Sequence, residues 1–371
     1  MWLGLLAVPF AGIVAASEIA TAIFAGMLLV QVFRSLDASG IFKGVHTTVC
    51  KGQSCLDSFK SGPMRAVAII VILAFLVALP FFANRYTLDI ATQTGIYIVL
   101  ALGLNIVVGQ TGILVLGYVA FYAVGAYCYA LLSTKAGIGF WPVLPIAAFM
   151  AGIFGLLLGA PTLRLRGDYL AIVTLGFGEI TRIALNNMDS LTGGPNGVSG
   201  IPRPSLGPLQ FQSLTHYYFV VLAMMALTVF VVTRLSASRI GRAWIAIRED
   251  EVAAEAMGVN TTGLKLLAFA LGAMLAGLAG VLYSAKMGFV SPESFNFFES
   301  VIILCMVVLG GMGSIPGVIL GAVVLYLLPE GLREFQQYRM LIFGAAMVAM
   351  MVFRPQGLIG TKRRGMEMGA G

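Results

Sequence analysis

Long apolar runs separated by short polar loops are the feature that most restricts what this chain can fold into. Residues 140–160 and 217–233 contain no charged side chain. A helix of about 20 such residues crosses the hydrocarbon core of a bilayer. Only 11% of all residues are charged, against about 25% in a soluble domain. The sequence therefore predicts an all-α polytopic membrane protein.

Basic residues in the polar loops predict the orientation, because cytoplasmic loops carry an excess of Lys and Arg. The stretch 34–65 and the tail after residue 360 are basic, so both are placed in the cytoplasm. The loop 188–216 contains a single Arg or Lys, Arg203, and is placed outside. The net charge of +7 is accounted for in this way and does not require a nucleic-acid partner.

The number of apolar runs predicts about ten transmembrane, broken or re-entrant helical segments. Residues 1–65 are expected to form an N-terminal transmembrane helix and a cytoplasmic loop. Residues 66–360 form the transmembrane domain, and residues 361–371 form a cytoplasmic tail. Cys50 and Cys55 share the first loop with His46, but these three do not complete a four-ligand site, so we predict no metal.

A charged stretch at 234–265 interrupts the apolar pattern and is placed in the cytoplasm. The acids at 249–251 suit the positive end of a helix, and Ile245 and Val252 fall on one face at helical spacing. Gly258 would end this single short helix in a left-handed conformation. A helix so short is marginal alone in water, so we expect it to dock on another surface. A plain solvated loop is the alternative.

Two glycine-rich breaks lie in the two halves of the chain. They comprise Gly109, Gln110, Thr111 and Gly112 in the first half, and Gly310, Gly311 and Gly313 in the second. The second break separates 299–309 from 315–328, which are each too short to span a bilayer, so a broken or re-entrant hairpin is predicted. Paired breaks point to inverted repeats and a translocation pathway near the midplane. Ordinary helix-packing glycines are the alternative.

Two charges lie within the apolar run 169–187. Glu179 and Arg182 are three residues apart, so they face the same side of a helix. Charges inside a membrane span are functional candidates. An ion pair that orients the helix is favoured over a proton relay.

The predicted outer loop contains a compact turn motif. Its residues are Thr192, Gly193, Gly194, Pro195, Asn196 and Gly197. Such residues supply turn geometry by themselves. The motif therefore has two equally favoured interpretations. It is either a contact site for an extracytoplasmic protein or a plain tight turn.

Several stretches carry a resemblance to a known family. Residues 163–187 read LRLRGDYLAIVTLGFGEITRIALNN, and 191–202 read LTGGPNGVSGIP. Further matches are LGLNIVVGQTGILVLGYVAFYAVGAY at 102–127, GRAWIAIREDEVAAEAMGV at 241–259, GFVSPESF at 288–295, VVLGGMGS at 307–314 and FRPQGLIG at 353–360. Together they resemble the permease subunits of branched-chain amino acid ABC transporters, of the LivM type.

The resemblance implies a subunit of a complex in a bacterial inner membrane. The complex would contain a sister permease, two ATP-binding subunits and an extracytoplasmic substrate-binding protein. The implied fold is that of the ribose and vitamin B12 importers, and the implied substrates are leucine, isoleucine and valine, though relatives carry other amino acids, urea or amides. This chain has no Gly-x4-Gly-Lys-Ser/Thr phosphate loop, so it would hold no cofactor, and ATP and Mg²⁺ would bind the partner subunits.

The resemblance also implies a role for the stretch 234–265 as the coupling loop that docks on an ATPase. Its residues match the family motif Glu-Ala-Ala, three residues, Gly, with one residue inserted after the acid. The predicted coupling residues are Arg242, Glu251, Ala253, Ala254 and Gly258. No residue is predicted to be catalytic.

Three other functions compete with this one. An ion-coupled secondary transporter would need a coupling carboxylate near the midplane, and Glu179 is the candidate. A channel for a small neutral solute would conduct without ATP. A membrane scaffold would transport nothing.

Overall fold

Five helices in the described part of the chain are long and apolar enough to cross a membrane. The computed structural model describes residues 76–80, 84–162, 165, 167–206, 209–210, 213–331, 344, 348 and 357–358. The chain divides into two units, Met1–Ala78 and Leu79–Gly371, and everything below concerns the second. The helix and loop predicted for 1–65, with Cys50 and Cys55, and the tail 361–371 lie outside the described residues.

Three of the five spans are single α-helices, and each of the other two combines an α-helix with a short helical turn that continues it. They are α4 (Arg85–Leu104) with the π-helical η1 (Asn105–Gln110), α6 (Phe140–Thr162), α9 (Leu214–Ala237), α12 (Thr261–Met287), and η3 (Pro292–Phe295) with α13 (Phe297–Gly310). The remaining long helices are α5 (Val119–Lys135), α7 (Asp168–Asn187) and α14 (Ile315–Gly331). The described chain is thus mostly helical, as predicted, whereas the total of ten segments stays a prediction.

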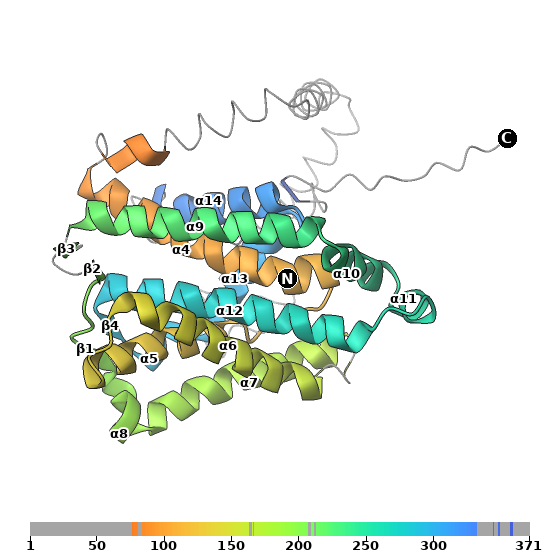
Figure 1. Ribbon diagram of the computed structural model, residues 1–371, viewed down its shortest axis with the longest axis horizontal. Coiled ribbons are helices and arrows are strands. Elements are labelled where there is room, and N and C mark those ends of the chain that lie inside the picture. Colours follow the sequence, from red (N-terminus) through yellow and green to blue (C-terminus); the bar gives the residue numbers. More distant parts are fainter. Residues whose placement is uncertain are drawn as a thin grey trace, which may run out of the picture. The chain divides into compact units, whose positions relative to one another are not determined.

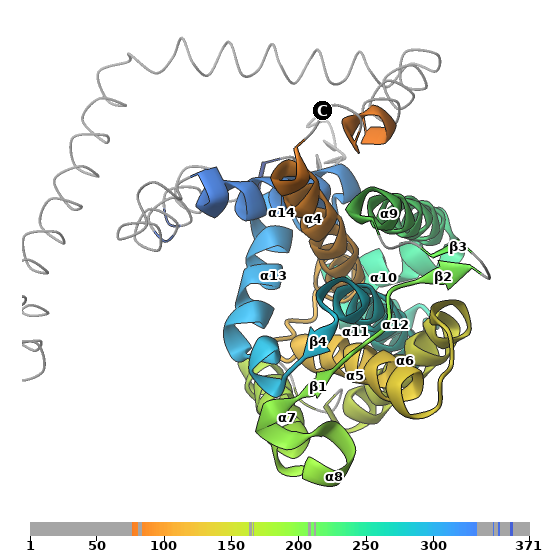
Figure 2. The same ribbon diagram turned by 90° about the vertical axis from the view of Figure 1, so that its left-hand side faces the viewer.

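Helix α12 lies in the middle of the bundle and packs against α4, α5 and α6 (Figure 2). Small residues on α12 allow this close approach. A Cβ atom at Gly280 would lie 2.6 Å from the backbone nitrogen of Ala126 in α5, and one at Gly272 would lie 3.1 Å from the carbonyl oxygen of Gly103 in α4. Small residues that bring backbones together are typical of helix packing in membranes.

The break predicted at 310–314 is present as a turn between two antiparallel helices. Helix α13 ends at Gly310, α14 begins at Ile315, and the two helices pack together. Gly311 and Gly313 have φ values of 111° and 83°, which residues with a side chain rarely adopt. The prediction that 299–309 is too short to span a bilayer is wrong, because η3 extends α13 into the 19-residue candidate span Pro292–Gly310. The depth of this hairpin in a membrane stays a prediction.

Two sets of small elements lie at opposite ends of the long helices (Figure 1). One end holds α8 (Asp189–Thr192), η2 (Gly194–Asn196), and two short antiparallel pairs, β1 (Val198–Ser199) with β4 (Phe289–Val290) and β2 (Ser205–Leu206) with β3 (Leu209–Gln210). In the first pair Val198 is opposite Val290. The other end holds α10 (Arg239–Glu249) and α11 (Glu251–Ala256).

Candidate functional site

Helix α10, the first part of the charged stretch, docks on its own chain. The hydroxyl of Ser238 accepts a hydrogen bond from the backbone nitrogen of Gly241 and caps the helix start. Trp244 is fully buried, and its Nε1 donates to the carbonyl oxygen of Leu264 at 2.8 Å, next to the start of α12. Ile247 is buried on the same face, one turn further on. This face attaches α10 to the bundle.

The prediction that Ile245 and Val252 share one helix face is wrong, because the chain leaves helical geometry at Asp250. The acids do stand at a helix start, as predicted, since Asp250 caps α11 and Glu251 is its first residue. Asp250 has φ −156° and ψ 108°, and its Oδ1 accepts from the backbone nitrogen of Ala253 at 3.0 Å. An Asp in this extended conformation is a favoured helix cap, so it ends α10 and begins α11. Ile245 and Val252 therefore belong to different helices.

The end of α11 has the geometry predicted for Gly258. Gly258 has φ +84°, and its nitrogen donates to the carbonyl oxygen of Glu255 at 2.9 Å. The nitrogen of Val259 donates to the carbonyl oxygen of Ala254. Such a left-handed glycine satisfies carbonyl groups at a helix C-terminus. Glu251 is fixed by an ion pair with Lys265 at the start of α12.

The predicted coupling residues are divided between an exposed and a buried face. Ala253, Gly258 and Arg242 are exposed, whereas Ala254 is buried within this chain. Val252 and Met257 leave 67% and 85% of their surface exposed. The exposed side of α11 thus presents apolar groups at the tip of a charged segment.

Arg248, in the last turn of α10, reaches into the bundle and meets both glycine-rich breaks. Its Nη1 donates to the carbonyl oxygen of Gly109 at 2.5 Å. A Cβ atom at Gly313 would lie 3.0 Å from the same Nη1. A Cβ atom at Gly112, which has φ +74°, would lie 2.8 Å from Cγ of Arg248. The structure thus brings together two breaks that are about 200 residues apart in the sequence.

The two breaks also contact each other directly. The side-chain oxygen of Asn105 accepts from the backbone nitrogen of Gly313 at 2.8 Å. Gln110 donates through Nε2 to the hydroxyl of Ser236, near the end of α9, at 2.5 Å. Asn105 and Gln110 are the first and last residues of the π-helical turn η1, a form that is often found at functional sites. We call Asn105, Gly109, Gln110, Ser236, Arg248 and Gly313 the junction.

Four of the predicted pathway residues are not part of the junction, and one of them, Gly112, borders Arg248. Gly310 packs against the backbone of Gly317 within the α13–α14 hairpin, and Gly311 approaches Gly357. Thr111 bonds within its own helix, to the carbonyl oxygen of Val107. For Gly310 the contacts favour the alternative of a packing glycine.

Comparison with known proteins decides the family. The model of the branched-chain amino acid transport system permease component matches residues 86–351. The chain belongs to this family. With its candidate spans, it is therefore a multi-pass membrane permease.

The similar proteins are transport permeases by name. The high-affinity branched-chain amino acid transport system permease protein LivM of Salmonella typhimurium is 49% identical, over 82% of this chain and 77% of the relative. LivM of Escherichia coli is 51% identical, over 78% of this chain and 74% of the relative. The permease protein LivH of E. coli is 28% identical, over 71% of this chain and 91% of the relative. No solved structure matches the chain significantly.

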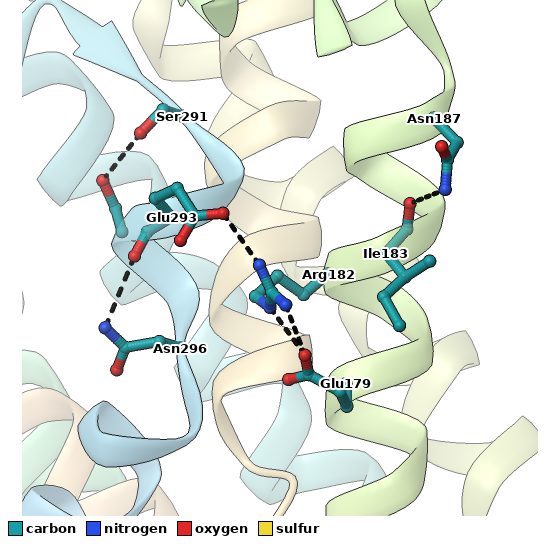
Figure 3. Close-up of polar contacts among 8 residues, drawn as sticks. Glu179, Arg182, Ile183, Asn187, Ser291, Glu293 and Asn296 are labelled. Carbon is teal, nitrogen blue, oxygen red and sulfur yellow. Dashed lines mark hydrogen bonds and ion pairs between the residues drawn. The ribbon is translucent and has the colours of Figure 1, made fainter. Parts of the chain in front are cut away.

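Glu179 and Arg182 of the permease form an ion pair that extends to a third charge (Figure 3). Arg182 Nη2 lies 2.5 Å from Glu179 Oε1, and Nη1 lies 2.8 Å from Oε1 of Glu293 in η3. The guanidinium therefore lies between two carboxylates from different elements (Figure 3). The pair joins α7 to the segment that precedes α13.

The turn motif at 192–197 has structural roles for most of its residues. Thr192 is buried, and its hydroxyl donates to the carbonyl oxygen of Leu185 at 2.6 Å. Gly193, Gly194 and Gly197 have φ values of 74°, 56° and 67°. Pro195 and Asn196 are exposed. Pro195 and Asn196 are thus the most accessible residues of the motif for a contact with an extracytoplasmic protein.

Sequence reasoning missed several polar residues that the fold brings together. Arg248 was one of five basic residues in a charged stretch, and nothing local distinguished it. Asn105 and Ser236 lie within or beside apolar runs and carry no charge. Glu299, in the first turn of α13, accepts from the Tyr97 hydroxyl of α4 at 2.9 Å. Its position in an apolar run was the one signal that could have identified it.

Proposed function

We propose that this chain is the membrane permease subunit of an ATP-driven importer of leucine, isoleucine and valine or related small solutes. The observation that carries the proposal is the identity of about half the residues to two LivM proteins over most of each chain. Both relatives are named as permeases for branched-chain amino acids, which gives the proposed transported class. The chain itself would supply the pathway and would hold no cofactor.

The partners proposed are a sister permease, two ATP-binding subunits and an extracytoplasmic binding protein, in a bacterial inner membrane. LivM and LivH of E. coli carry the name of one transport system, and this chain resembles both. That double likeness supports a heterodimer of two related permeases. Pro195 and Asn196 are the exposed residues proposed to meet the binding protein.

The segment from Arg242 to Gly258 is proposed to dock on an ATP-binding subunit. Val252 and Met257 support this, because apolar side chains so exposed on a polar segment are typical of a protein contact. Closure of the ATP-binding subunits would move the segment as a rigid body and open the pathway between the permeases. The glycine-rich breaks are proposed to line or control that pathway.

An ion-coupled transporter is a weaker candidate. It would need a carboxylate that gains and loses a proton during transport, and Glu179 was the candidate. In the structure Glu179 is paired with Arg182, which also holds Glu293. A close cation favours the charged form of a carboxylate, so Glu179 is poorly placed for that task.

The test is reconstitution of the chain with its proposed partners in proteoliposomes. Radiolabelled leucine uptake should require internal ATP and the external binding protein. The chain alone, under a proton or sodium gradient, should move no leucine. Gradient-driven uptake by the isolated chain, or an inactive complete complex, would argue against the proposal.

A further inference from the structure

We propose that Arg248 is the positioning residue that transmits movement of α10 to the two glycine-rich breaks, by holding them together in one state and releasing them in the other. The inference rests on the proposed function, because it assumes that an ATP-binding subunit moves α10. The inference goes beyond the proposed docking of α11 because it concerns a contact inside the permease, between Arg248 and the glycine-rich breaks.

The first support is that one side chain joins three separate parts of the chain. Arg248 belongs to α10, Gly109 to η1, which continues α4, and Gly313 to the turn between α13 and α14. Its Nη1 donates to the Gly109 carbonyl oxygen at 2.5 Å and lies close to Gly313. Displacement of the last turn of α10 therefore changes the surroundings of both breaks.

The second support is that the glycines at the junction make room for this side chain. A Cβ atom at Gly112 would press on the Arg248 stem, and one at Gly313 would reach its guanidinium. A Cβ atom at Gly109 would lie 2.5 Å from the nitrogen of Gly313. Side chains at these positions would displace either Arg248 or one break from the other.

The third support is that α10 is attached at its middle and reaches inward at its end. Trp244 is fully buried and bonded to the Leu264 carbonyl oxygen, so it fixes one point of the helix. Arg248 lies one turn further on, and α11 with its exposed apolar groups follows directly. Ile247 is buried on the same face, so Arg248 lies between this anchored face and α11, and a force applied to α11 reaches Arg248 through the last turn of α10.

The fourth support is spare hydrogen-bonding capacity at the junction. Nδ2 of Asn105 and Oε1 of Gln110 are buried and have no partner among the described residues. Buried polar groups are normally paired, and an arginine carries five N–H donors. Gln110 Oε1 is therefore an acceptor that the Arg248 guanidinium would use in the second state.

The first experiment compares two arginines of α10 in the reconstituted complex. Arg248→Gln removes the junction contact, and Arg248→Lys keeps the charge without the planar guanidinium. Arg239→Gln is the control, because Arg239 is exposed in the first turn of the same helix. Assembly, ATPase activity with and without binding protein, and leucine uptake are measured for each.

Arg248→Gln should assemble but lose about tenfold or more in uptake per ATP hydrolysed, which is within the usual range of coupling between sites. Arg248→Lys should recover part of that ratio, and Arg239→Gln should match the unaltered complex. A ratio for Arg248→Gln equal to that of the control would overturn the proposal. An inactive unaltered complex would instead count against the proposed function.

A second experiment covers the case in which Arg248→Gln does not assemble. Gln110→Cys and Ser236→Cys are combined in a background without native cysteines, because these side chains meet at the junction. The pair should form a disulfide in the nucleotide-free complex and much less of it with ATP and vanadate. Equal cross-linking in both states would show that the junction does not open, and would overturn the proposal.

Discussion

The guanidinium of Arg248 donates a hydrogen bond to the carbonyl oxygen of Gly109, 139 residues earlier in the chain. The contact joins a charged helix at one end of the bundle to a π-helical turn at the end of α4. Arg248 leaves 29% of its side chain exposed, so the side chain is partly withdrawn from solvent. Hydrogen bonds from a charged donor are about twice as strong as neutral ones, so this contact contributes to the position of both elements.

Gly258→Val should uncouple leucine uptake from ATP hydrolysis. Gly258 has φ +84° and open space around it, so the obstacle to a side chain is backbone strain and not a clash. A left-handed conformation costs a residue with a side chain at least about 1–2 kcal/mol. Gly258→Asn is the control, since Asn tolerates this conformation. Uptake per ATP is measured in both, and a normal ratio for Gly258→Val would contradict the prediction.

Trp244→Ala should destabilise the end of the permease that carries α10. Trp244 is fully buried, and removal of so large a core side chain typically costs about 3–5 kcal/mol. Trp244→Phe should cost less, because it keeps a large buried ring and loses mainly the hydrogen bond from Nε1 to the Leu264 carbonyl oxygen, which contributes about 0.5–1.5 kcal/mol. Met257→Ala, at a residue 85% exposed, is the control. Denaturant unfolding in detergent compares the variants, and equal stabilities would refute the packing of α10.

Gly280→Ala should prevent normal folding, whereas Gly176→Ala should be tolerated. A Cβ atom at Gly280 would overlap the backbone of α5 near Tyr122 and Ala126, which cannot move without the helix. A Cβ atom at Gly176 meets nothing within 4 Å, and Ala is the better helix former by about 1 kcal/mol. The yield of monodisperse protein after extraction measures the difference. Equal yields of the two variants would show that α5 and α12 do not approach each other as closely at Gly280 as the structure indicates.

Glu255 and Asn196 should be accessible from opposite sides of the membrane. Both are exposed, and they lie in segments at opposite ends of the long helices (Figure 1). A single Cys replaces each in turn in a background without native cysteines. In intact cells a membrane-impermeant thiol reagent should label Asn196→Cys but not Glu255→Cys. The reverse pattern would invert the predicted orientation.

Several features of this permease follow from the sequence alone because they depend on local properties. Apolar composition predicts membrane-spanning helices, and Gly258 ends α11 as expected because glycine adopts φ +84° without the strain that most side chains would cause. The turn at 310–314 was predicted from two short apolar segments and the glycines between them. Family motifs, spread over most of the chain, identified the permease family, which the comparison confirms.

Tertiary structure decided which of these local features meet. The Asp250 cap divides a segment that was predicted as one helix, because an Asp side chain can either remain in a helix or cap the next one. The two glycine-rich breaks were recognised separately, but their contact depends on how α10 and the α13–α14 hairpin pack against α4 and η1. Arg248 looked like any cytoplasmic arginine in the sequence. Only the packing of three distant segments brings Gly109 and Gly313 within its reach, since hydrogen bonds depend on distance in space and not on separation along the chain.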